Sequence, residues 1–439
     1  MKAEIRYHNA LLNVEFPDTS RIYLSSYDTP AASAKELALE AVRNPIGSAS
    51  LVDSIKKRPL SSVVIAVSDI TRPIPYQDFL PALLYEIEST GIDRKSITIL
   101  IATGMHRPST AEERLFMFGK ELAESYVIVD HDAQGEMDIL SGKSHSGAPV
   151  KLSSIFAKAD YKMVVGLVEP HFMAGFSGGR KTVCPGLSSL DTIKQFHGYE
   201  FLSHPNAFSS RLEKNPCHEE ALSVAKLAGV DFSLQLVVNH EKKIVKAFGG
   251  DLFESHAVAC RYASQNACPI VEAEADVVVT GCGGYPLDAT FYQCVKALVN
   301  ALPCVKNGGT MIAAGGCKEG VGSQTFEAML RKYQNDFPGF IRDIKKTSDI
   351  VKDQWQIQMQ ARVYEKTGVD KIHFFTHGIA SGHSSFLGVN ILEAASDRIT
   401  EKLQKTVDDL AGKGCSFAVI PEGPYCAPQS KKERIVDNE

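Results

Sequence analysis

The stretch Met163–Thr182 reads M-V-V-G-L-V-E-P-H-F-M-A-G-F-S-G-G-R-K-T. Its first six residues form an apolar run that is typical of a buried strand. The run ends in Glu169, a histidine, several glycines and the pair Arg180-Lys181. Glycines allow a backbone to approach a ligand closely and to turn its N–H groups toward an anion. A G-G-R-K segment alone is more often a surface turn with two solvated cations, so its meaning depends on its surroundings.

Similar apolar runs recur through the first half of the chain, and amphipathic stretches separate them. A short β-rich segment precedes this series. Strands that alternate with helices predict a parallel, doubly wound sheet. The expected strands are Val63–Val67, Ile97–Ile101, Tyr126–Val129 and Met163–Val168, and the expected helices are Ala34–Arg43, Phe79–Glu88 and Ala111–Glu124.

A second series of the same kind begins after Cys268-Pro269. We therefore predict two α/β domains with mostly parallel, doubly wound sheets, 1–268 and 269–439, and an active site in the cleft between them. The expected strands of the second series are Ala275–Thr280, Thr310–Ala314, Lys371–Thr376 and Phe417–Ile420, and the long helical patterns are Ser348–Lys366 and Ile391–Leu410.

The composition of the chain excludes several classes of protein. Its 439 residues are 44% hydrophobic and 23% charged, as in ordinary globular proteins. A net charge of −5 argues against a nucleic-acid or anionic-membrane partner. No apolar run approaches the roughly 20 residues that span a bilayer, and the start lacks the apolar block of a signal peptide. Ten scattered cysteines without a C-x-x-C pair indicate reduced thiols in a cytoplasmic protein, with neither a disulfide framework nor a cysteine zinc site.

Polar side chains follow each expected strand of the first half. Parallel sheets bind ligands beyond the carboxyl ends of their strands, so these side chains are expected to converge. Each has an ordinary explanation, such as an Asx turn at Asp69 or a loop position for His106 ahead of a Thr110/Glu113 capping box. As a set they favour function. They are Ser68, Asp69, Thr71 and Arg72; Thr103, Gly104 and His106; Asp130, His131 and Asp132; and Glu169, His171 and Lys181.

Two further helices carry polar residues of interest. The segment Ser188–Gly198 is expected to be a short helix capped by Ser188, with Gly198 in the left-handed position after it and His197 in its last turn. A single histidine there is more often structural than a metal ligand.

The helix expected from about Ala289 has an apolar stripe formed by Phe291, Cys294, Val295 and Leu298. Its opposite arc carries Tyr292, Gln293 and Lys296. That arc is either a solvated face or a catalytic face in the interdomain cleft.

Over nearly its whole length the chain resembles the nickel-dependent lactate racemase family. Each motif is weak by itself, and six in order are specific. They are S-D-I-T-R-P (Ser68–Pro73), T-G-M-H-R (Thr103–Arg107), E-P-H (Glu169–His171), F-S-G-G-R-K (Phe176–Lys181), Q-F-H-G around His197, and Y-Q-C-V-K (Tyr292–Lys296).

The resemblance implies a nickel pincer nucleotide, pyridinium-3,5-bisthiocarboxylic acid mononucleotide, which grips nickel through S, C and S atoms. Cofactor-synthesis and nickel-insertion enzymes would be maturation partners. By this resemblance Lys181 holds the cofactor through a thioamide and His197 completes the nickel coordination. His106 and His171 are the acid/base pair. Asp69 supports a histidine or the cofactor. The remaining assignments are Ser177, Gly178, Gly179 and Arg180 to the cofactor, and Arg72, Tyr292, Gln293 and Lys296 to the substrate.

The implied reaction is racemisation or epimerisation at C2 of a 2-hydroxy acid. The α-hydrogen beside a carboxylate is a very poor acid, so its removal as hydride is the alternative to proton removal. One histidine would take the hydroxyl proton, and a planar 2-keto acid would form. Two histidines serve the two enantiomers, because their hydroxyl groups lie on different sides. The resemblance does not identify which 2-hydroxy acid is the substrate.

Three other functions compete with this hypothesis. Gly175–Thr182 is close to a phosphate-binding P-loop, but Arg180 stands where its last glycine should be. A zinc hydrolase could use Asp69, His106, His131 and His171, although their spacing matches no known ligand helix. A relative that binds the cofactor without racemase activity is the third.

Overall fold

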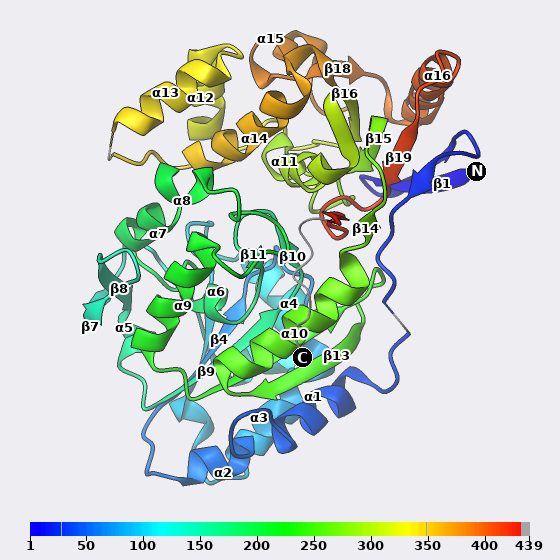
Figure 1. The fold of residues 1–439 in the computed structure, drawn as a ribbon. Coiled ribbons are helices and arrows are strands. Elements are labelled where there is room, and N and C mark those ends of the chain that lie inside the picture. The colour runs from blue at the N-terminus through cyan, green and yellow to red at the C-terminus, as the bar shows by residue number, and fades with distance from the viewer. Residues whose placement is uncertain (28, 348, 432–439) are drawn as a thin grey trace. The chain divides into compact units, whose positions relative to one another are not determined.

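We describe a computed structural model of this chain for residues 1–27, 29–347 and 349–431 (Figure 1). These residues form two compact units. Unit 1 comprises Met1–Ser26, Gly198–Ser210 and the described chain from Asn266 onward, and unit 2 comprises Tyr27–His197 and Arg211–Gln265. Each unit is built on its own six-stranded sheet.

The sheet of unit 2 has the strand order β13-β12-β9-β4-β5-β6. Every neighbouring pair is parallel except β12 and β13, which are antiparallel. The four strands β4, β5, β9 and β12 are almost continuously apolar and buried, as expected when helices cover both faces of a parallel sheet. Their bounds are β4 Val63–Ser68, β5 Ile97–Ala102, β6 Val127–Asp130, β9 Tyr161–Leu167, β12 Phe232–Val238 and β13 Ile244–Gly250.

The strand order reverses at β4, which lies between β5 and β9. Chain connections run from β4 to β5 and β6 on one side, whereas β9 and β12 extend the sheet on the other. Such a topological switch point opens a crevice beyond the carboxyl ends of the strands. The loops that follow β4, β5 and β9 therefore meet at the edge where this fold places ligands.

Local sequence explains the helix starts in unit 2. Ser33 and Glu36 form a capping box for α1, and Thr110 and Glu113 form the expected one for α4. The helices are α1 Ala34–Arg43, α2 Leu51–Lys56, α3 Leu80–Glu88, α4 Ala111–Ser125, α5 Ser154–Ala157, α6 Arg180–Val183, α7 Leu190–Phe196, α9 Pro216–Ala228 and α10 Leu252–Ala267; the small hairpins are β7 Met137–Lys143 with β8 Pro149–Ser153, and β10 Pro170–His171 with β11 Gly175–Phe176.

The sheet of unit 1 is parallel throughout, in the order β18-β17-β16-β15-β19-β3. Its strands are β3 Arg21–Ile22, β15 Ala275–Gly281, β16 Val305–Ala314, β17 Ile372–Thr376, β18 Asn390–Glu393 and β19 Phe417–Ile420; the other strand pairs are β1 Lys2–Tyr7 with β2 Ala10–Glu15, and β14 Ile270–Val271 with β20 Gln429–Ser430. The helices are α8 Tyr199–Ser203, α11 Phe291–Asn300, α12 Gln324–Tyr333, α13 Phe337–Lys346, α14 Gln354–Thr367, α15 Ser384–Leu387 and α16 Ile399–Ala411.

Short 3₁₀ helices complete the secondary structure. They are η1 Tyr76–Asp78, η2 Arg94–Ser96, η3 Leu302–Cys304, η4 Val369–Lys371, η5 Ser381–His383 and η6 Ser396–Arg398.

The first 26 residues belong to unit 1, although a cut at residue 268 assigns them to the other domain. The reason is physical. Ile5, Tyr7 and Val14 of the β1–β2 hairpin are buried in the same apolar core as strands β15 and β19, and β3 adds a parallel strand beside β19. Residues 198–210 also join unit 1, where Arg362 of α14 donates hydrogen bonds to the carbonyl groups of Ala207 and His204.

Four local expectations were wrong. Asn390–Glu393 is a strand, so the helix expected from Ile391 begins only at Ile399; parallel pairing with β17 overrides the helical pattern. The helix α7 is capped by Ser189 in place of Ser188. Gly198 has φ of −64°, so it is extended and not left-handed. Helix α14 begins at Gln354, later than expected, and Ser348 lies outside the described residues.

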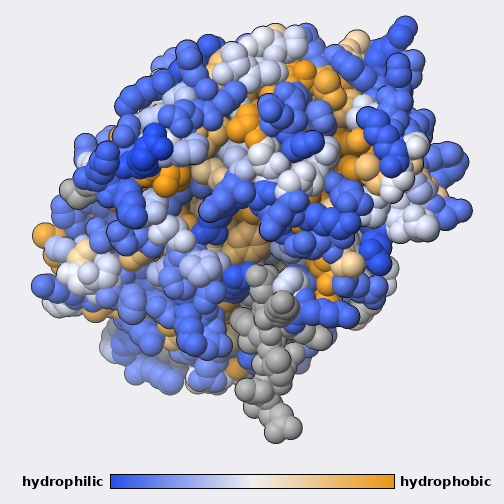
Figure 2. All heavy atoms as spheres, turned by 45° about the horizontal axis from the view of Figure 1, so that its top comes forward, coloured by the Kyte–Doolittle hydropathy of each residue, from blue (hydrophilic) through white to orange (hydrophobic). Residues whose placement is uncertain are grey.

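The face drawn in Figure 2 is mostly hydrophilic, and its hydrophobic patches are scattered, as is normal for protein surfaces. Within the described residues, no helix combines the length and apolar character needed to cross a membrane.

Candidate active site

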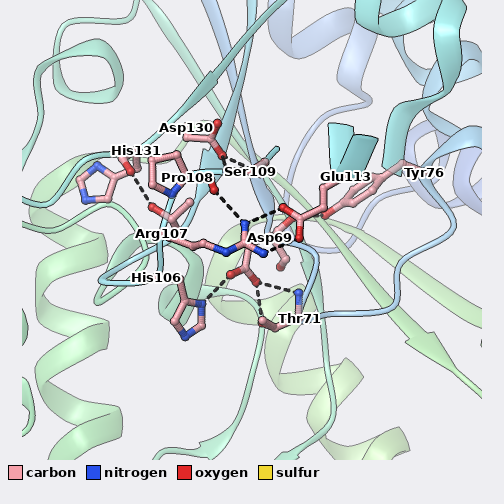
Figure 3. Close-up of polar contacts among 12 residues, drawn as sticks. Asp69, Thr71, Tyr76, His106, Arg107, Pro108, Ser109, Glu113, Asp130 and His131 are labelled. Carbon is pink, nitrogen blue, oxygen red and sulfur yellow. Dashed lines mark hydrogen bonds and ion pairs between the residues drawn. The ribbon is translucent and has the colours of Figure 1, made fainter. Parts of the chain in front are cut away.

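Asp69 and His106 form a hydrogen-bonded pair at the carboxyl edge of the sheet of unit 2. Asp69 follows β4 and His106 follows β5, and the distance from His106 Nδ1 to Asp69 Oδ2 is 2.6 Å (Figure 3). The other oxygen of Asp69 accepts hydrogen bonds from the hydroxyl and the backbone N–H of Thr71, at 2.6 and 3.3 Å. The Asx turn expected at Asp69 is therefore present, and it leaves Oδ2 to orient the histidine.

Burial would raise the pKa of the Asp69 carboxyl, but the charge and hydrogen bond of His106, the bond from Thr71 and the charge of Arg72 together lower it below 3.8. Asp69 is therefore an anion, and Nδ1 of His106 is the donor. In its neutral form His106 then carries its lone pair on Nε2. The His106 side chain is 52% exposed, whereas that of Asp69 is 10% exposed.

Arg107, the residue after His106, binds the start of helix α4. Arg107 donates two hydrogen bonds to Glu113 of the capping box, at 2.6 and 2.7 Å (Figure 3). His131, at the end of β6, is buried, with its Nε2 2.9 Å from the carbonyl oxygen of Ser188. Both residues fix the loops around His106.

Arg72 and Glu169 join the two loops that flank the switch point. Arg72 follows β4, Glu169 follows β9, and Arg72 Nη1 lies 2.6 Å from Glu169 Oε1. Both side chains are mostly buried, with exposed fractions of 19% and 14%. A guanidinium has further N–H donors in its planar fork, so this bond leaves Arg72 able to hold a second carboxylate.

His171 lies in the tight β10–β11 hairpin and is 8% exposed. Its Nδ1 accepts hydrogen bonds from the backbone N–H groups of Met173 and Ala174, at 3.3 and 3.2 Å. The ring is therefore anchored to its own turn through one nitrogen.

The glycine-rich loop packs tightly onto strand β9 and its neighbours. A Cβ on Gly166 would lie 2.9 Å from Gly178 Cα, and one on Gly179 would lie 2.4 Å from the His256 ring. Gly178 and Gly179 have φ of +69° and +51°, a region that glycine adopts easily.

Two polar side chains bind this loop from within. The Gly179 N–H donates to Gln235 Oε1 at 2.8 Å, and the Ser177 hydroxyl donates to the Leu167 carbonyl at 2.6 Å. The structure thus gives these residues a role in shaping the loop, and direct contact of Ser177, Gly178 and Gly179 with a cofactor stays a prediction.

Arg180 is 1% exposed, and all of its hydrogen-bond acceptors in the structure are neutral. Burial, followed by the neighbouring guanidinium charge, lowers the pKa of His218 to about 3 and that of His256 well below 6.5, so both rings are uncharged acceptors. Burial lowers the pKa of Arg180 to about 10, which leaves the guanidinium protonated at neutral pH. The acceptors are Nδ1 of His218, Nε2 of His256 and the carbonyl oxygens of Ala174 and Gly178.

Lys181 and His197 are electrostatic neighbours. Burial lowers the pKa of His197 to about 3, against a bond to Ile193, and the Lys181 charge lowers it further. Its Nδ1 lies 2.8 Å from the Ile193 carbonyl oxygen, so this nitrogen is the donor and the neutral ring has its lone pair on Nε2. A buried, neutral imidazole whose other nitrogen is held by a carbonyl has the arrangement of a metal-binding histidine.

Comparison with known proteins places this arrangement in a family. Residues 7–210 match the family described as lactate racemase N-terminal domain, and residues 270–424 match the lactate racemase C-terminal domain. The lactate racemase of Thermoanaerobacterium thermosaccharolyticum is 35% identical over 367 residues, which cover 82% of this chain and 85% of that protein. The lactate racemase of Lactiplantibacillus plantarum is 32% identical over 395 residues, or 89% and 90% of the two chains.

The chain belongs to the lactate racemase family. It is an isomerase of the racemase type. The structure of the lactate racemase apoprotein from Thermoanaerobacterium thermosaccharolyticum aligns with a TM-score of 0.86 and 31% identity, over 98% of this chain and 100% of that one. A protein from Thermotoga maritima shares the fold, with a TM-score of 0.67 at 17% identity over 87% and 96% of the two chains. The expected family and α/β fold are thereby confirmed.

Three predicted substrate residues of this racemase lie on α11 of unit 1. The apolar stripe of α11 is fully buried, and Tyr292, Gln293 and Lys296 are the helix positions that keep partial exposure. Trp355 Nε1 donates to the Tyr292 hydroxyl at 3.0 Å. Gln293 Oε1 is buried, with no hydrogen-bond partner among the described residues. Such a buried polar atom calls for an explanation, and a ligand would supply one. A meeting of these three residues with the histidines of unit 2 stays a prediction.

The residues packed behind the candidate loops were not visible from the sequence. Gln235 was the most accessible to prediction, because a glutamine in the apolar run Phe232–Val238 is unusual. Asn215, His218 and His256 come from distant segments and carry no motif that would link them to Arg180.

The P-loop alternative finds little support in this racemase. A P-loop glycine segment leads directly from a strand into a long helix, whereas here the β10–β11 hairpin intervenes and α6 has four residues. Across residues 1–27, 29–347 and 349–431, no group of three or more His, Cys, Asp or Glu side chains is arranged to hold a metal ion.

Proposed function

We propose that this racemase inverts C2 of a 2-hydroxy acid, lactate or a larger relative, by removing the α-hydrogen as hydride and returning it through a 2-keto acid. The cofactor we propose is the nickel pincer nucleotide attached to Lys181. The observation that carries the proposal is that the loops after β4, β5 and β9 are joined by two close contacts, from His106 to Asp69 and from Arg72 to Glu169, at the switch point of a doubly wound sheet.

The residues of unit 2 fit this cofactor. The cofactor would supply S, C and S donors to nickel, so one further ligand would come from the protein. His197 matches that requirement because its burial keeps it neutral and its Nδ1 is held by a carbonyl. Lys181 is close enough to influence the pKa of His197, as a tether beside the metal ligand must be. Gln235 Nε2 is buried beneath the loop without a partner among the described residues, which adds a donor that a bound group could use.

When bound, the cofactor would supply an acceptor for hydride. Residues of the chain would transfer the hydroxyl proton. His106, with Nδ1–H held by Asp69, accepts the hydroxyl proton at Nε2, and the Asp69 carboxylate stabilises the imidazolium that results. His171 is the corresponding group for the other enantiomer.

Substrate binding follows from the cationic side chains. Arg72 holds the carboxylate through its fork, which lets the planar keto acid rotate about a fixed end. We propose that Tyr292, Gln293 and Lys296 complete the site from unit 1. Burial and the nearby Asp353 raise the pKa of Tyr292, so it acts as a neutral hydroxyl. Enzymes that make the cofactor and insert nickel are then required partners for maturation.

The experiment uses enantiopure lactate carrying deuterium at C2 and the enzyme prepared with its cofactor-making enzymes. Loss of optical rotation with deuterium kept at C2 in ordinary water supports hydride return. Exchange of the deuterium for solvent hydrogen contradicts it, because a proton removed by histidine would mix with water. His106→Gln should lose about 10²–10⁴-fold in rate. His145→Gln, which removes an exposed histidine paired with Glu219, should not.

A further inference from the structure

The two histidines of the proposed site use the same ring atom in opposite senses. Nδ1 of His106 donates to the Asp69 carboxylate at 2.6 Å. Nδ1 of His171 accepts from the N–H groups of Met173 and Ala174 at 3.3 and 3.2 Å. A neutral imidazole has one N–H and one lone pair. The lone pair is therefore on Nε2 in His106, whereas His171 has its hydrogen on Nε2.

The turn that sets the His171 tautomer is held by its two carbonyl groups. Asn215 Nδ2 donates to the Met173 carbonyl at 2.9 Å, and Arg180 Nη2 donates to the Ala174 carbonyl at 2.6 Å. The Met173 carbonyl and the Ala174 N–H belong to one peptide plane, so Asn215 holds that N–H toward the His171 ring. Arg180 holds the next peptide plane of the same turn, on the other side of the Ala174 Cα.

Arg180 is itself buried and hydrogen-bonded through all three of its guanidinium nitrogens. Helix α9 contributes to both contacts with the turn. Asn215, which binds the Met173 carbonyl, is its N-cap, and His218, which accepts a hydrogen bond from Arg180 Nε at 2.9 Å, lies in its first turn. His256 of α10 lies 2.9 Å from Arg180 Nη1. A buried guanidinium with neutral acceptors gains no stability from charge pairing. Charge pairing therefore does not explain why Arg180 is buried at this position.

We propose that Arg180 is a positioning residue that fixes His171 as a hydrogen-bond donor at Nε2, while Asp69 fixes His106 as an acceptor at Nε2. The resting protein then presents one imidazole ready to take a proton and one ready to donate a hydrogen bond. Reaction from the enantiomer whose hydroxyl faces His171 requires that ring to exchange its tautomer first. This inference rests on the proposed function for the role of the two rings, but the tautomers are properties of the protein without cofactor.

The test is a ¹⁵N NMR measurement of the histidine ring nitrogens in the apoprotein at about pH 9, where an ordinary imidazole is neutral. His106 and His171 are assigned with His106→Gln and His171→Gln. The expected spectrum has a pyrrole-type Nδ1 in His106 and a pyrrole-type Nε2 in His171. The same tautomer in both rings overturns the proposal.

Arg180 variants test the positioning role. In Arg180→Met the ¹⁵N shifts of His171 should move toward the average of the two tautomers, while those of His106 stay in place. Arg180→Lys, whose ammonium can replace only one contact, should give a smaller shift and provides a folded comparison if the methionine variant does not fold. Arg58→Met is the control, because Arg58 also grips a backbone carbonyl, that of Asp160, at an exposed site. An unchanged His171 spectrum in a folded Arg180 variant overturns the proposal.

These readouts separate the inference from the proposed function. Racemisation without the two tautomers leaves the proposed function intact and ends the inference. If the two tautomers are found but the enzyme does not racemise 2-hydroxy acids, the inference stands and the proposed function is wrong.

Discussion

At the scale of single residues, four histidines of unit 2 are defined by what holds one of their nitrogens. A carboxylate holds His106, a carbonyl holds His197, backbone N–H groups hold His171, and a guanidinium donates to His218. The partner decides whether the other nitrogen is a donor or an acceptor. The same residue type therefore serves as proposed base, proposed metal ligand and scaffold within unit 2.

The pair of Asp69 and His106 should appear in the pH dependence of stability. The pKa of Asp69 is lowered in the folded protein, so its contribution is fully present above the unfolded value near 3.8 and is lost as pH falls through the folded value. Asp69→Asn should remove this contribution. We expect the difference in unfolding free energy between wild type and variant, measured by urea denaturation, to shrink from about pH 5 to about pH 3. A difference that stays constant or grows toward low pH would contradict the pairing.

Sequence could predict which residues gather at this edge, because the position after a parallel strand is visible as the end of an apolar run. Asp69, His106 and Glu169 were found in this way. Their partners were less visible. The bond from Arg72 to Glu169 depends on β4 lying beside β9, a neighbour relation that spans about a hundred residues and has no local pattern.

At the scale of elements, capping decides where the helices next to the site begin. Thr110→Ala removes the side-chain acceptor for the Glu113 N–H, 3.2 Å away, and should lower the unfolding free energy by about 1 kcal/mol. Thermal or urea unfolding measures it. Thr406→Ala, in the exposed interior of α16, is the control and should change stability by less than about 0.5 kcal/mol. Equal losses in the two variants would show that the cap contributes nothing specific.

The glycine-rich loop should depend on Gly166 of β9. An alanine Cβ there meets backbone atoms of Gly178 and Gly179 at 2.9 and 3.1 Å, and backbone cannot move aside as a side chain can. Gly166→Ala should cost about 1–3 kcal/mol of unfolding free energy and should reduce cofactor attachment at Lys181. The comparison is Gly382→Ala, where nothing lies within 4 Å of the added atom. A Gly166→Ala protein with normal stability would show that the loop can shift freely.

Helix and strand patterns predicted most elements, and the exceptions are informative. Residues 390–393 have a helical pattern but form β18, because the open edge of β17 offers parallel hydrogen bonds that local propensity does not register. Gly198 fits a left-handed cap by composition, yet the chain leaves α7 in an extended conformation at the point where it passes from unit 2 to unit 1.

At the scale of the whole molecule, the reactivity of the cysteines measures how well the two cores are packed. All ten are free, and only Cys415 among them is not fully buried. Burial raises the pKa of the thiols of Cys184, Cys282, Cys294, Cys304 and Cys426, to about 12 for Cys184, which makes them poor nucleophiles. A thiol reagent should therefore label about one cysteine quickly in the native protein and all ten in guanidinium chloride. Rapid native labelling of several thiols would contradict this picture of the two cores.

The division of the molecule was only partly visible in the sequence. The transition near residue 268 follows from the restart of the strand–helix series. The transfer of residues 1–26 to unit 1 does not, because a two-stranded hairpin with alternating polarity can pack on any exposed apolar face, and its partner lies hundreds of residues away.

The most direct test of the central claim is the cofactor load of the mature protein. The wild type is produced with its cofactor-making and nickel-inserting enzymes, and intact mass and nickel content are measured together with those of Lys181→Met, His197→Ala and the control Lys151→Met, an exposed lysine paired with Asp191. The account predicts one adduct and close to one nickel per chain in the wild type and the control, no adduct in Lys181→Met, and an adduct with little nickel in His197→Ala. An adduct that persists in Lys181→Met, or nickel that binds equally well in His197→Ala, would contradict it.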